Sequence, residues 1–514
     1  MSVKEVSDRS EVDQHLAALL SNASAIRAVT EAVQGTLGPK GLDCMLVDQF
    51  GGVLVTNDGV TILKTMDVNH PAARILISAA EHQEEQVGDG TTTTTVIAGT
   101  LIGEGVNQVV RGVPVSKVIE GVKLGIEDAL MELKKAVTPI TDLNSPILEK
   151  ISLIAGRGQH QLAQLIIDAV RLIGGTKLRE PGFKLADYIL ALEGSESCLI
   201  QGTIIDKEPL NKEMPRRITG GRILILDDAL EPEKIDPEAL GTETGFNRLI
   251  QNEQDLKSNL RKLAEIGVKA IFTDRSISDL AEDLLTDLGI LGVARVAMHE
   301  WRRLAEMTGA RPIKKLSLAK SAEELIKLTG EVGNIQVDEE FKQIRIGCAP
   351  NQRYVTIVVG AYTKEVVGER ERIAKDAAAA VQAAWLGGVV PGGGSIELAL
   401  ARRLNVKIPH GLTSYGYNCV VDSLKRPMTQ ICINAGFNPL EKLEEALAAQ
   451  EEKNSVSIGI NCDSGAVEDL TESGIYDPYF VKYYACKSAG EVAEAILRIN
   501  TIIKMKEATG SATC

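Results

Sequence analysis

The sequence predicts a multidomain protein that is mainly helical towards both ends of the chain and α/β in the middle. Its 514 residues exceed the roughly 250–300 residues at which a single hydrophobic core stops growing, so we expect two or three domains. Apolar residues recur at helical spacing near both ends, whereas short apolar runs alternate with polar helical segments between about residues 202 and 363. The simplest interpretation is a helical domain made from both chain ends, into which an α/β domain is inserted.

The elements of the first part follow from local signals. A helix is predicted over 10–34, because Ser10 is a good N-cap and Gly35 is a natural end. A turn at 36–41 and a strand–turn–strand segment over 45–63 come next. Helices are then predicted from Pro71 to about Ala136 and over 147–172.

The middle of the chain contains the predicted strands. The apolar runs are ILIL (223–226), VKAIF (268–272) and ILGVARV (290–296). After Thr363 the helical pattern returns and continues almost to the end. The most apolar stretch, 377–391, is interrupted by Gln382, two glycines and Pro391, and it is too short to span a bilayer.

Composition excludes several classes of function. A net charge of -14 argues against a surface built for nucleic-acid phosphates, and only 4% aromatic residues argues against base stacking. The eight cysteines contain no CxxC pair, which disfavours zinc ribbons and redox motifs and indicates a reduced, cytoplasmic protein. The polar N-terminus does not resemble a signal peptide. We therefore expect neither nucleic acid nor a membrane among the partners.

The strongest local signal is VGDGTTTTTVIAGTLIGEG at 87–105. Gly88 and Gly90 permit a close backbone approach to a ligand, and the five threonines Thr91–Thr95 open a helix. The N–H groups and positive dipole end of a helix N-terminus suit phosphate. Asp89 is well placed to hold Mg²⁺ through a hard oxygen ligand. The alternative is an ordinary helix cap, which the run of five threonines makes less attractive.

Three further turns are weaker signals when taken singly. TLGPKG (36–41) and VVPGGGS (389–395) are candidate nucleotide loops, and TNDGVTI (56–62) is predicted to be a hairpin turn. The sequence contains no GxxxxGK[ST], so a Walker-type ATPase is excluded. Phosphoryl transfer to water needs a metal and a group that orients or deprotonates the water, for which Asp58 and Asp376 are the candidates. Asp376 cannot be chosen among seventy acidic residues without further information.

That information comes from a resemblance. LGPKG, TNDGVTI, GDGTTTTTV and the GGG loop, in this order, resemble the ATP site of the chaperonin family. Asp376 lies sixteen residues before Gly392, as the family's catalytic aspartate does before its GGG loop, and IYDPYFVK (475–482) resembles the segment that closes over adenine and ribose. The resemblance covers essentially the whole chain.

The resemblance implies a set of site residues, an activity and its cofactors. The chain is expected to be a chaperonin ATPase that uses ATP and Mg²⁺, with K⁺ as a further option. Asp58 and Asp376 are expected to be catalytic, and Asp89 to bind Mg²⁺. The implied nucleotide-binding residues are Thr36, Leu37, Gly38, Pro39, Asn57, Gly59, Gly88, Asp89, Gly90, Thr91, Thr92, Thr93, Arg157, Gly392, Gly393 and Asp477.

It also implies three domains. A mainly α-helical equatorial ATPase domain is expected over 1–140 and 393–514. A small α/β intermediate hinge domain would occupy 141–204 and 354–392, and an α/β apical domain would occupy 205–353. Because Asp376 falls in the intermediate domain, closing that domain onto the nucleotide would complete the site and move the apical domain.

The subtype follows from segment 231–263. This segment occupies the position of the helical protrusion of group II chaperonins, the archaeal and eukaryotic-cytosolic type, and the bacterial class called group III fits equally well. A built-in lid without a separate lid protein is therefore implied. Phe246, Leu249, Ile250, Leu256, Leu260 and Leu263 form an apolar series within it, which either packs in a core or contacts clients and neighbouring lids.

One position departs from the group II pattern. The stretch IAGRGQH places Arg157 where group II has a lysine that senses the γ-phosphate. Arginine is always charged and binds as a fork, whereas lysine is a point charge. Arg157 is therefore either a modified sensor or an ordinary surface residue.

The implied partners are unfolded client proteins and further copies of the chain, in stacked double rings of about eight subunits each. Two alternatives remain open from the residues alone. A small-molecule kinase or phosphotransferase could use the same phosphate loops, and a ring-forming scaffold could lack ATPase activity, although the intact aspartates argue against the scaffold.

Overall fold

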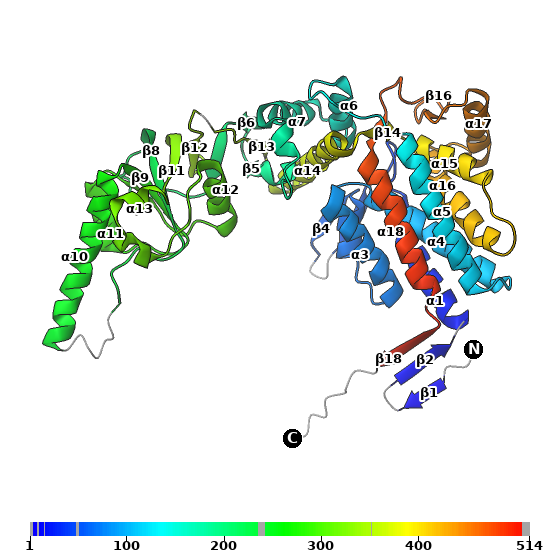
Figure 1. Cartoon of the computed structure of the whole chain (residues 1–514), viewed down its shortest axis with the longest axis horizontal. Helices are drawn as coiled ribbons and strands as arrows, with labels where there is room; N and C mark the ends of the chain where they lie inside the picture. The colour runs from blue at the N-terminus through cyan, green and yellow to red at the C-terminus, as the bar shows by residue number, and fades with distance from the viewer. Residues whose placement is uncertain are drawn as a thin grey trace. The chain divides into compact units, whose positions relative to one another are not determined.

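The computed structural model describes residues 4–7, 10–14, 16–47, 51–234, 242–350 and 352–505. The chain forms two compact units, one of Met1–Asp187 with Ala361–Cys514 and the other of Tyr188–Gly360 (Figure 1). The first unit therefore contains both chain ends, and the second is an insertion between them. Within the described residues, no helix is long and apolar enough to cross a membrane.

The first unit is mainly helical. Three of its helices begin with a proline directly after a capping side chain, at His70, Ser145 and Asn438, because proline lacks the N–H that a first helical turn cannot satisfy. Its helices are α1 (Leu16–Gln34), α2 (Gly59–Thr65), α3 (Pro71–Val87), α4 (Thr91–Val110), α5 (Val115–Lys135), α6 (Pro146–Ala155), α7 (His160–Ile173), α8 (Gly175–Leu178), α14 (Lys364–Gly387), α15 (Ser395–Asn405), α16 (Thr413–Asn434), α17 (Pro439–Glu452) and α18 (Tyr479–Leu497).

Helix α4 lies at the centre of this unit. It packs against α1, α16 and α18, so its neighbours come from both ends of the chain (Figure 1). The buried core includes Ile97, Leu101 and Ile102 of α4 together with Ile496 and Leu497 of α18. Helices α5 and α16 are joined further by a 2.7 Å hydrogen bond from the Tyr417 hydroxyl to Asp128.

Short strands complete the first unit. They form one three-stranded sheet and three two-stranded pairs. The sheet has the order β1 (Lys4–Ser7), β2 (Ser10–Gln14) and β18 (Thr501–Met505), and the pairs are β3 (Cys44–Val47) with β4 (Val53–Thr56), β14 (Val389–Pro391) with β17 (Tyr476–Pro478), and β15 (Ile458–Ile460) with β16 (Val467–Asp469).

Two predicted elements of the first unit are wrong. The helix predicted over 10–34 begins only at Leu16, because Ser10–Gln14 pairs antiparallel with the C-terminal strand β18. The hairpin β3–β4 is confirmed, but its second strand ends at Thr56. TNDGVTI is not a hairpin turn, since Asp58 caps α2 and residues 59–65 are helical. The helices predicted over 71–136 and 147–172 are confirmed.

The second unit is an α/β domain. Its main sheet has the order β10-β9-β8-β11-β12-β7, in which β8, β9 and β10 are parallel and the other pairs antiparallel. The predicted strands at 223–226 and 268–272 are confirmed, whereas only 291–293 of the third run is a strand. The elements are β5 (Ile189–Glu193), β6 (Cys198–Ile200), β7 (Gly202–Ile205), β8 (Arg217–Leu226), α10 (Glu243–Glu265), β9 (Val268–Thr273), α11 (Asp279–Asp287), β10 (Leu291–Val293), α12 (Met298–Thr308), α13 (Ala322–Ile326), β11 (Gly330–Asp338), β12 (Gln343–Gly347) and β13 (Thr356–Ala361).

The apolar series of segment 231–263 divides into two halves along α10. Leu256, Leu260 and Leu263 are buried, so the C-terminal half of the helix packs in the core of the second unit. Phe246 and Ile250 in the N-terminal half are 55% and 40% exposed. Residues 235–241 of this segment lie outside the described residues. One helix therefore has both a packed half and an exposed apolar half.

Candidate ATP-binding site

Asp58 lies at the start of α2, where the strand β4 ends. Its carboxylate accepts hydrogen bonds from the backbone N–H and the hydroxyl of Thr61, at 3.0 and 2.5 Å, and so caps the helix. Thr56 supports the same turn, because its hydroxyl accepts a 3.1 Å hydrogen bond from the Asp58 N–H. The side-chain oxygen of Asn57 is buried and has no hydrogen-bond partner within the described part of the chain. A buried acceptor of this kind is available to a ligand or to water.

The GDG turn joins α3 to α4 through two left-handed residues. Gly88 ends α3 with φ of 66°, and Gly90 precedes α4 with φ of 83°, conformations that favour glycine. No side chain caps the N-terminus of α4. Between the two glycines, Asp89 accepts a 2.5 Å hydrogen bond from the Gly90 N–H. The helix end is thus open to an anion, with a carboxylate beside it.

The turn around Asp58 lies against this helix end. A β-carbon added to Gly59 would lie 2.4 Å from the hydroxyl oxygen of Thr92. Thr91 and Thr93 are buried, and the Thr94 hydroxyl bonds back to the Gly90 carbonyl at 2.9 Å. The first turn of α4 is therefore stabilised by its own threonine side chains. The N–H groups of Thr91, Thr92 and Thr93 precede the first intrahelical hydrogen bond and can bind an anion.

The GGG loop and Asp477 meet through a strand pair. Strand β14 leads into the loop and pairs with β17, so that Val390 lies opposite Asp477. A β-carbon on Gly392 would lie 3.2 Å from the Asp477 carboxyl carbon, and the Gly392 N–H donates to the Ile475 carbonyl at 3.0 Å. Gly393 and Gly394 follow in the left-handed conformation and lead into α15.

Gln83 ties α18 to the GDG turn. Its side-chain amide donates to the carbonyls of Asp89 and Val481, at 2.9 and 3.1 Å. A β-carbon on Gly90 would lie 2.6 Å from Val481. Segments more than 380 residues apart in the chain are therefore in direct contact at the turn.

The turn at 36–41 is anchored on α16. The Asn434 side chain donates to the carbonyls of Gln34 and Leu37 at 2.9 and 2.8 Å. Thr36 bonds back to Val33, and Lys40 forms an ion pair with Asp463 at 2.5 Å. A β-carbon on Gly38 would lie 3.0 Å from Ile431 of α16, and one on Gly394 would lie 3.1 Å from Met428, one turn earlier on the same helix. The two predicted loops therefore share one supporting helix, and Pro39 lies within the first of them.

Three carboxylates at the centre of the site have raised pKa values, and the charge of a fourth, Asp58, contributes to each rise. Burial, followed by the charges of Glu84, Asp89 and Asp58, raises the pKa of Asp376 well above its usual value, while Arg157 acts in the opposite direction. Burial, followed by Asp58 and Asp89, raises the pKa of Glu84 to about 7. These groups are therefore mutually close and under-neutralised.

Asp89 has the same kind of surroundings. Burial and then Asp477 raise its pKa to about 6, although the Gly90 N–H and Lys482 oppose the shift. Lys482 is nearly fully buried between Asp477 and Glu397, with ion pairs of 2.8 and 2.7 Å. Burial acts to lower the pKa of Lys482, but these two carboxylates outweigh it and raise the pKa further. Its charge is thus already paired.

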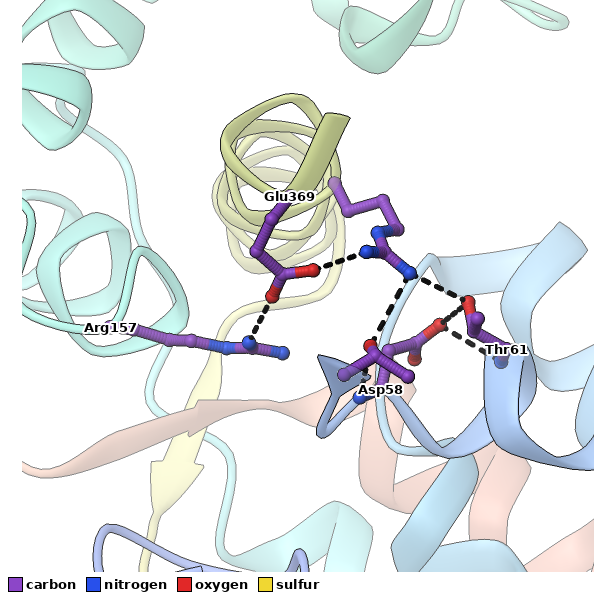
Figure 2. A network of polar contacts seen from close by, with 6 residues as sticks. Asp58, Thr61, Arg157 and Glu369 are labelled. Atoms are coloured by element: carbon purple, nitrogen blue, oxygen red, sulfur yellow. Dashed lines mark hydrogen bonds and ion pairs between the residues drawn. The ribbon is translucent and has the colours of Figure 1, made fainter. Parts of the chain in front are cut away.

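Arg157 belongs to a polar network beside the carboxylates. It lies in the loop between α6 and α7 with φ of 52°, and its guanidinium donates to Glu369 at 2.8 Å (Figure 2). Arg372 binds the other oxygen of Glu369 and reaches the hydroxyls of Thr56 and Thr61 at 3.3 and 3.4 Å. The network therefore connects Arg157 to the turn that Asp58 begins.

Sequence analysis missed Glu84, Glu369, Arg372 and Lys482. Lys482 falls inside the quoted segment IYDPYFVK, five residues after Asp477, so a helical start at Tyr479 was the signal that could have identified it. Glu84 lies one turn before the cap Gly88, on the same face of α3, and is within electrostatic reach of Asp58 and Asp89. Glu369 and Arg372 share the charged face of α14 with many other residues, and no local pattern singles them out.

The arrangement suits a polyphosphate with a divalent cation. The N-terminus of α4 offers N–H groups to phosphate, and among the ion pairs of the described residues none joins a lysine or arginine to Asp58, Glu84, Asp89 or Asp376. Within the described residues, no group of three or more histidine, cysteine, aspartate or glutamate side chains has metal-site geometry. Mg²⁺ fits this case, since it is usually held by one or two carboxylates together with substrate phosphates and waters.

Comparison with known proteins identifies the family of the chain. The chain matches the TCP-1/cpn60 chaperonin family over residues 29–507. It is 34% identical to a thermosome subunit of Methanocaldococcus jannaschii, over 95% of this chain and 92% of the relative. It is 36% identical to the thermosome subunit beta of Archaeoglobus fulgidus, over 94% and 91%. A crystal structure of a group III chaperonin in the open state matches with a TM-score of 0.88 and 43% identity, covering 95% of this chain and 99% of that chain.

These findings confirm the resemblance drawn from the motifs and do not support the phosphotransferase alternative. The family model, the relatives and the solved structure each match nearly the full length of the chain. The matched span therefore includes the α/β unit that the alternative would treat as a small-molecule substrate domain. The chain belongs to the TCP-1/cpn60 chaperonin family, as a group II-like, ATP-hydrolysing chaperonin that assists protein folding.

Proposed function

We propose that hydrolysis takes place between the N-terminus of α4 and the Asp376 face of α14. Asp89 binds Mg²⁺, and Asp58 and Asp376 orient or deprotonate the attacking water. The observation that carries the proposal is the convergence of buried carboxylates from distant segments, three of them with raised pKa values, beside the N-terminus of α4. A water-activating group works best with a pKa near the working pH, so the raised pKa of Asp376 supports its role.

The nucleotide is proposed to lie among the loops that converge here. Gly88, Gly90 and the first threonines of α4 would receive the phosphates, and Asp477 beside Gly392 would lie near the ribose and adenine. When bound, Mg²⁺ supplies charge neutralisation at the phosphates. K⁺ is a further candidate cation at the same phosphates.

We propose three domains within the two compact units. The equatorial domain comprises 1–140 and 393–514, the intermediate domain 141–204 and 354–392, and the apical domain 205–353. Asp376 then lies on the intermediate domain and Asp58 and Asp89 on the equatorial domain. Supporting this division, Asp376 reaches the other carboxylates from α14, a helix separate from those that carry the nucleotide loops. Hinged movement of the intermediate domain would couple hydrolysis to closure.

The assembled protein is proposed to be a homo-oligomeric double ring in the cytoplasm, with about eight subunits in each ring. The names of the relatives as thermosome subunits support an assembly. Its clients would be unfolded or partly folded proteins, enclosed without a separate lid protein. The exposed apolar half of α10, with Phe246 and Ile250, supports a built-in lid that contacts clients or neighbouring lids. The seven described cysteines are free, which fits a reducing compartment.

Arg157 is proposed to sense the γ-phosphate. Its charge lowers the pKa of Asp376, so it lies within electrostatic reach of the site. Arg157 is paired with Glu369, an interaction that a γ-phosphate could replace. A contact made with ATP and lost with ADP would bias the intermediate domain towards closure.

The catalytic roles predict a clear difference between two alanine variants. Asp376→Ala should bind ATP normally but hydrolyse it roughly 10²–10⁴-fold more slowly, as expected for the loss of a general base. Asp89→Ala should weaken binding of Mg-nucleotide itself, with little effect on binding measured without Mg²⁺. Steady-state hydrolysis and titration calorimetry with and without Mg²⁺ separate the two effects. Normal turnover by Asp376→Ala would remove this residue from the mechanism.

The crowded carboxylates predict an unusual pH dependence of stability. The folded protein binds a proton at Glu84 more tightly than the unfolded chain, because its pKa is raised from 4.5 to about 7. This contribution to the free energy of unfolding is present below pH 4.5 and is lost as the pH rises through 7. The melting temperature of Glu84→Gln, relative to the unmutated protein, should therefore rise between pH 5 and pH 8.

Mg-ADP should reduce the rise in the melting temperature of Glu84→Gln relative to the unmutated protein, because a bound cation stabilises the ionised carboxylates. The matched control is Glu85→Gln, which removes the same charge from the exposed neighbouring residue. Equal trends in the two variants would contradict the proposal that the Glu84 surroundings cause the effect.

The lid proposal predicts the effect of a short deletion. Asn252 donates a 2.9 Å hydrogen bond to the Glu233 carbonyl, so the ends of the protruding part lie side by side. Replacing 235–250 with a Gly-Ser linker should leave ATP hydrolysis measurable and keep the buried Leu256 and Leu260 in place. The variant should no longer shield a bound client from protease in ATP. Full protection by the shortened protein would show that this segment is not a lid.

The Arg157 proposal predicts a change in nucleotide discrimination. Loss of a charge-assisted hydrogen bond costs roughly 1.5–3 kcal/mol, on the order of ten- to a hundredfold in affinity. Arg157→Ala should therefore reduce the difference between the ATP and ADP affinities and uncouple closure from ATP binding. Arg157→Lys should restore much of the affinity difference and of the coupling. Binding titrations of the three proteins with ATP and ADP measure this. An unchanged gap in Arg157→Ala would identify an ordinary surface arginine.

A further inference from the structure

We propose that Arg372, braced by Glu369, is a positioning residue that sets Asp376 of α14 against the turn that carries Asp58. The inference rests on the proposed catalytic roles of these two aspartates. Among the hydrogen bonds of the described residues, those of Arg372 go to Glu369 and to the two hydroxyls that hold Asp58, and not to either aspartate.

The contacts of Arg372 converge on the Asp58 turn. One guanidinium nitrogen donates to the hydroxyls of Thr56 and Thr61, at 3.3 and 3.4 Å. Both hydroxyls already serve Asp58, since Thr56 accepts from its N–H at 3.1 Å and Thr61 donates to its carboxylate at 2.5 Å. The Thr61 hydroxyl has a single proton, which goes to Asp58, so its oxygen is an acceptor for Arg372. Each hydrogen bond between Arg372, the two threonines and Asp58 therefore pairs one donor with one acceptor (Figure 2).

Helix α14 connects the attachment at Arg372 rigidly to Asp376. Residues 372 and 376 are four apart in α14, so they lie on one face about 6 Å apart along the helix axis. Ala379 makes a second contact just beyond Asp376, where a β-carbon on Gly88 would lie 2.3 Å from the alanine β-carbon. Asp376 thus lies between two points at which α14 meets the nucleotide segments. Fixing the helix at both points fixes the carboxylate between them.

Glu369 makes the attachment rigid. Its two oxygens bind one arginine each, Arg372 one turn along the helix and Arg157 from the loop after α6 (Figure 2). All three side chains are about 30% exposed, so their orientation is restricted by partners rather than left to solvent. A guanidinium can serve Glu369 and two hydroxyls at once because its donors point in fixed, divergent directions. A lysine in the same place has three donors on one compact ammonium group and lacks the planar fork that spans Glu369 and both hydroxyls.

A positioning role makes a specific kinetic prediction for the full-length protein. Arg372→Met should lower kcat by on the order of ten- to a hundredfold, since small misplacements of a reacting group have effects of this size. The dissociation constant for ADP should change by less than about twofold, because the nucleotide loops themselves are intact. Arg372→Lys should recover part of kcat. The matched control is Lys375→Met on the same helix, whose removed charge pairs only with the neighbouring Glu371 among the described ion pairs, and its kcat should be normal.

A double variant separates positioning from a general loss of structure. In the Asp376→Ala background, Arg372→Met should cause no further fall in kcat, because the group that it positions is gone. Effects that multiply in the double variant, or a normal kcat in Arg372→Met, would overturn the inference. If Arg372→Met does not assemble, Arg372→Gln carries the same test.

The same set of proteins distinguishes this inference from the proposal on which it rests. Slow hydrolysis by Asp376→Ala together with normal hydrolysis by Arg372→Met overturns the positioning role alone. Normal hydrolysis by Asp376→Ala overturns the catalytic role of Asp376, and the positioning role with it.

Discussion

Burial of several carboxylates close to one another is the constraint around which the proposed ATP site is built. The pKa values of Glu84, Asp89 and Asp376 are raised first by burial and then by the charges of neighbouring carboxylates, among them Asp58. Ionising all of these buried groups together without a cation is unfavourable. Holding these buried carboxylates together costs stability at this one site, as is common for sites that bind a charged ligand.

The cations of the protein surround this cluster without neutralising it. Lys482 is held by Glu397 and Asp477, and Arg157 and Arg372 share Glu369. Each positive charge therefore has an acidic partner outside the four central carboxylates. Mg²⁺ bound with the nucleotide would offset part of the remaining negative charge, so under the proposed mechanism nucleotide binding and the stability of the surrounding elements are expected to be linked. Such linkage gives ATP a means of shifting α14 and the loop of Arg157.

Motifs with a fixed local geometry could be predicted from the sequence, whereas long-range partners could not. The GDG turn with its threonine helix was predictable because left-handed glycines and a helix N-terminus are encoded within a few residues. Residues 10–14 were assigned to the wrong element because their strand partner, 501–505, lies at the other end of the chain. Asp58 was placed in a hairpin turn because N-D-G suits both a turn and a helix cap, and only the packing of α2 decides between them. The roles of Arg372 and Glu369 could not be predicted, because they depend on the packing of α14 against the turn at 56–61.

The route of the chain has a further physical consequence for the site. Asp58 and Asp89 are encoded near the start, Asp376 after the inserted unit, and Lys482 near the end, and α4 packs against both α1 and α18. Asp376 can therefore join Asp58, Glu84 and Asp89 only after α14, which follows the inserted unit in the chain, has docked onto the N-terminal segments. Contacts between such distant segments are expected to form late, because the entropy of closing long loops must be overcome first. Until α14 has docked, the proposed ATP site consequently lacks one of its two proposed catalytic aspartates.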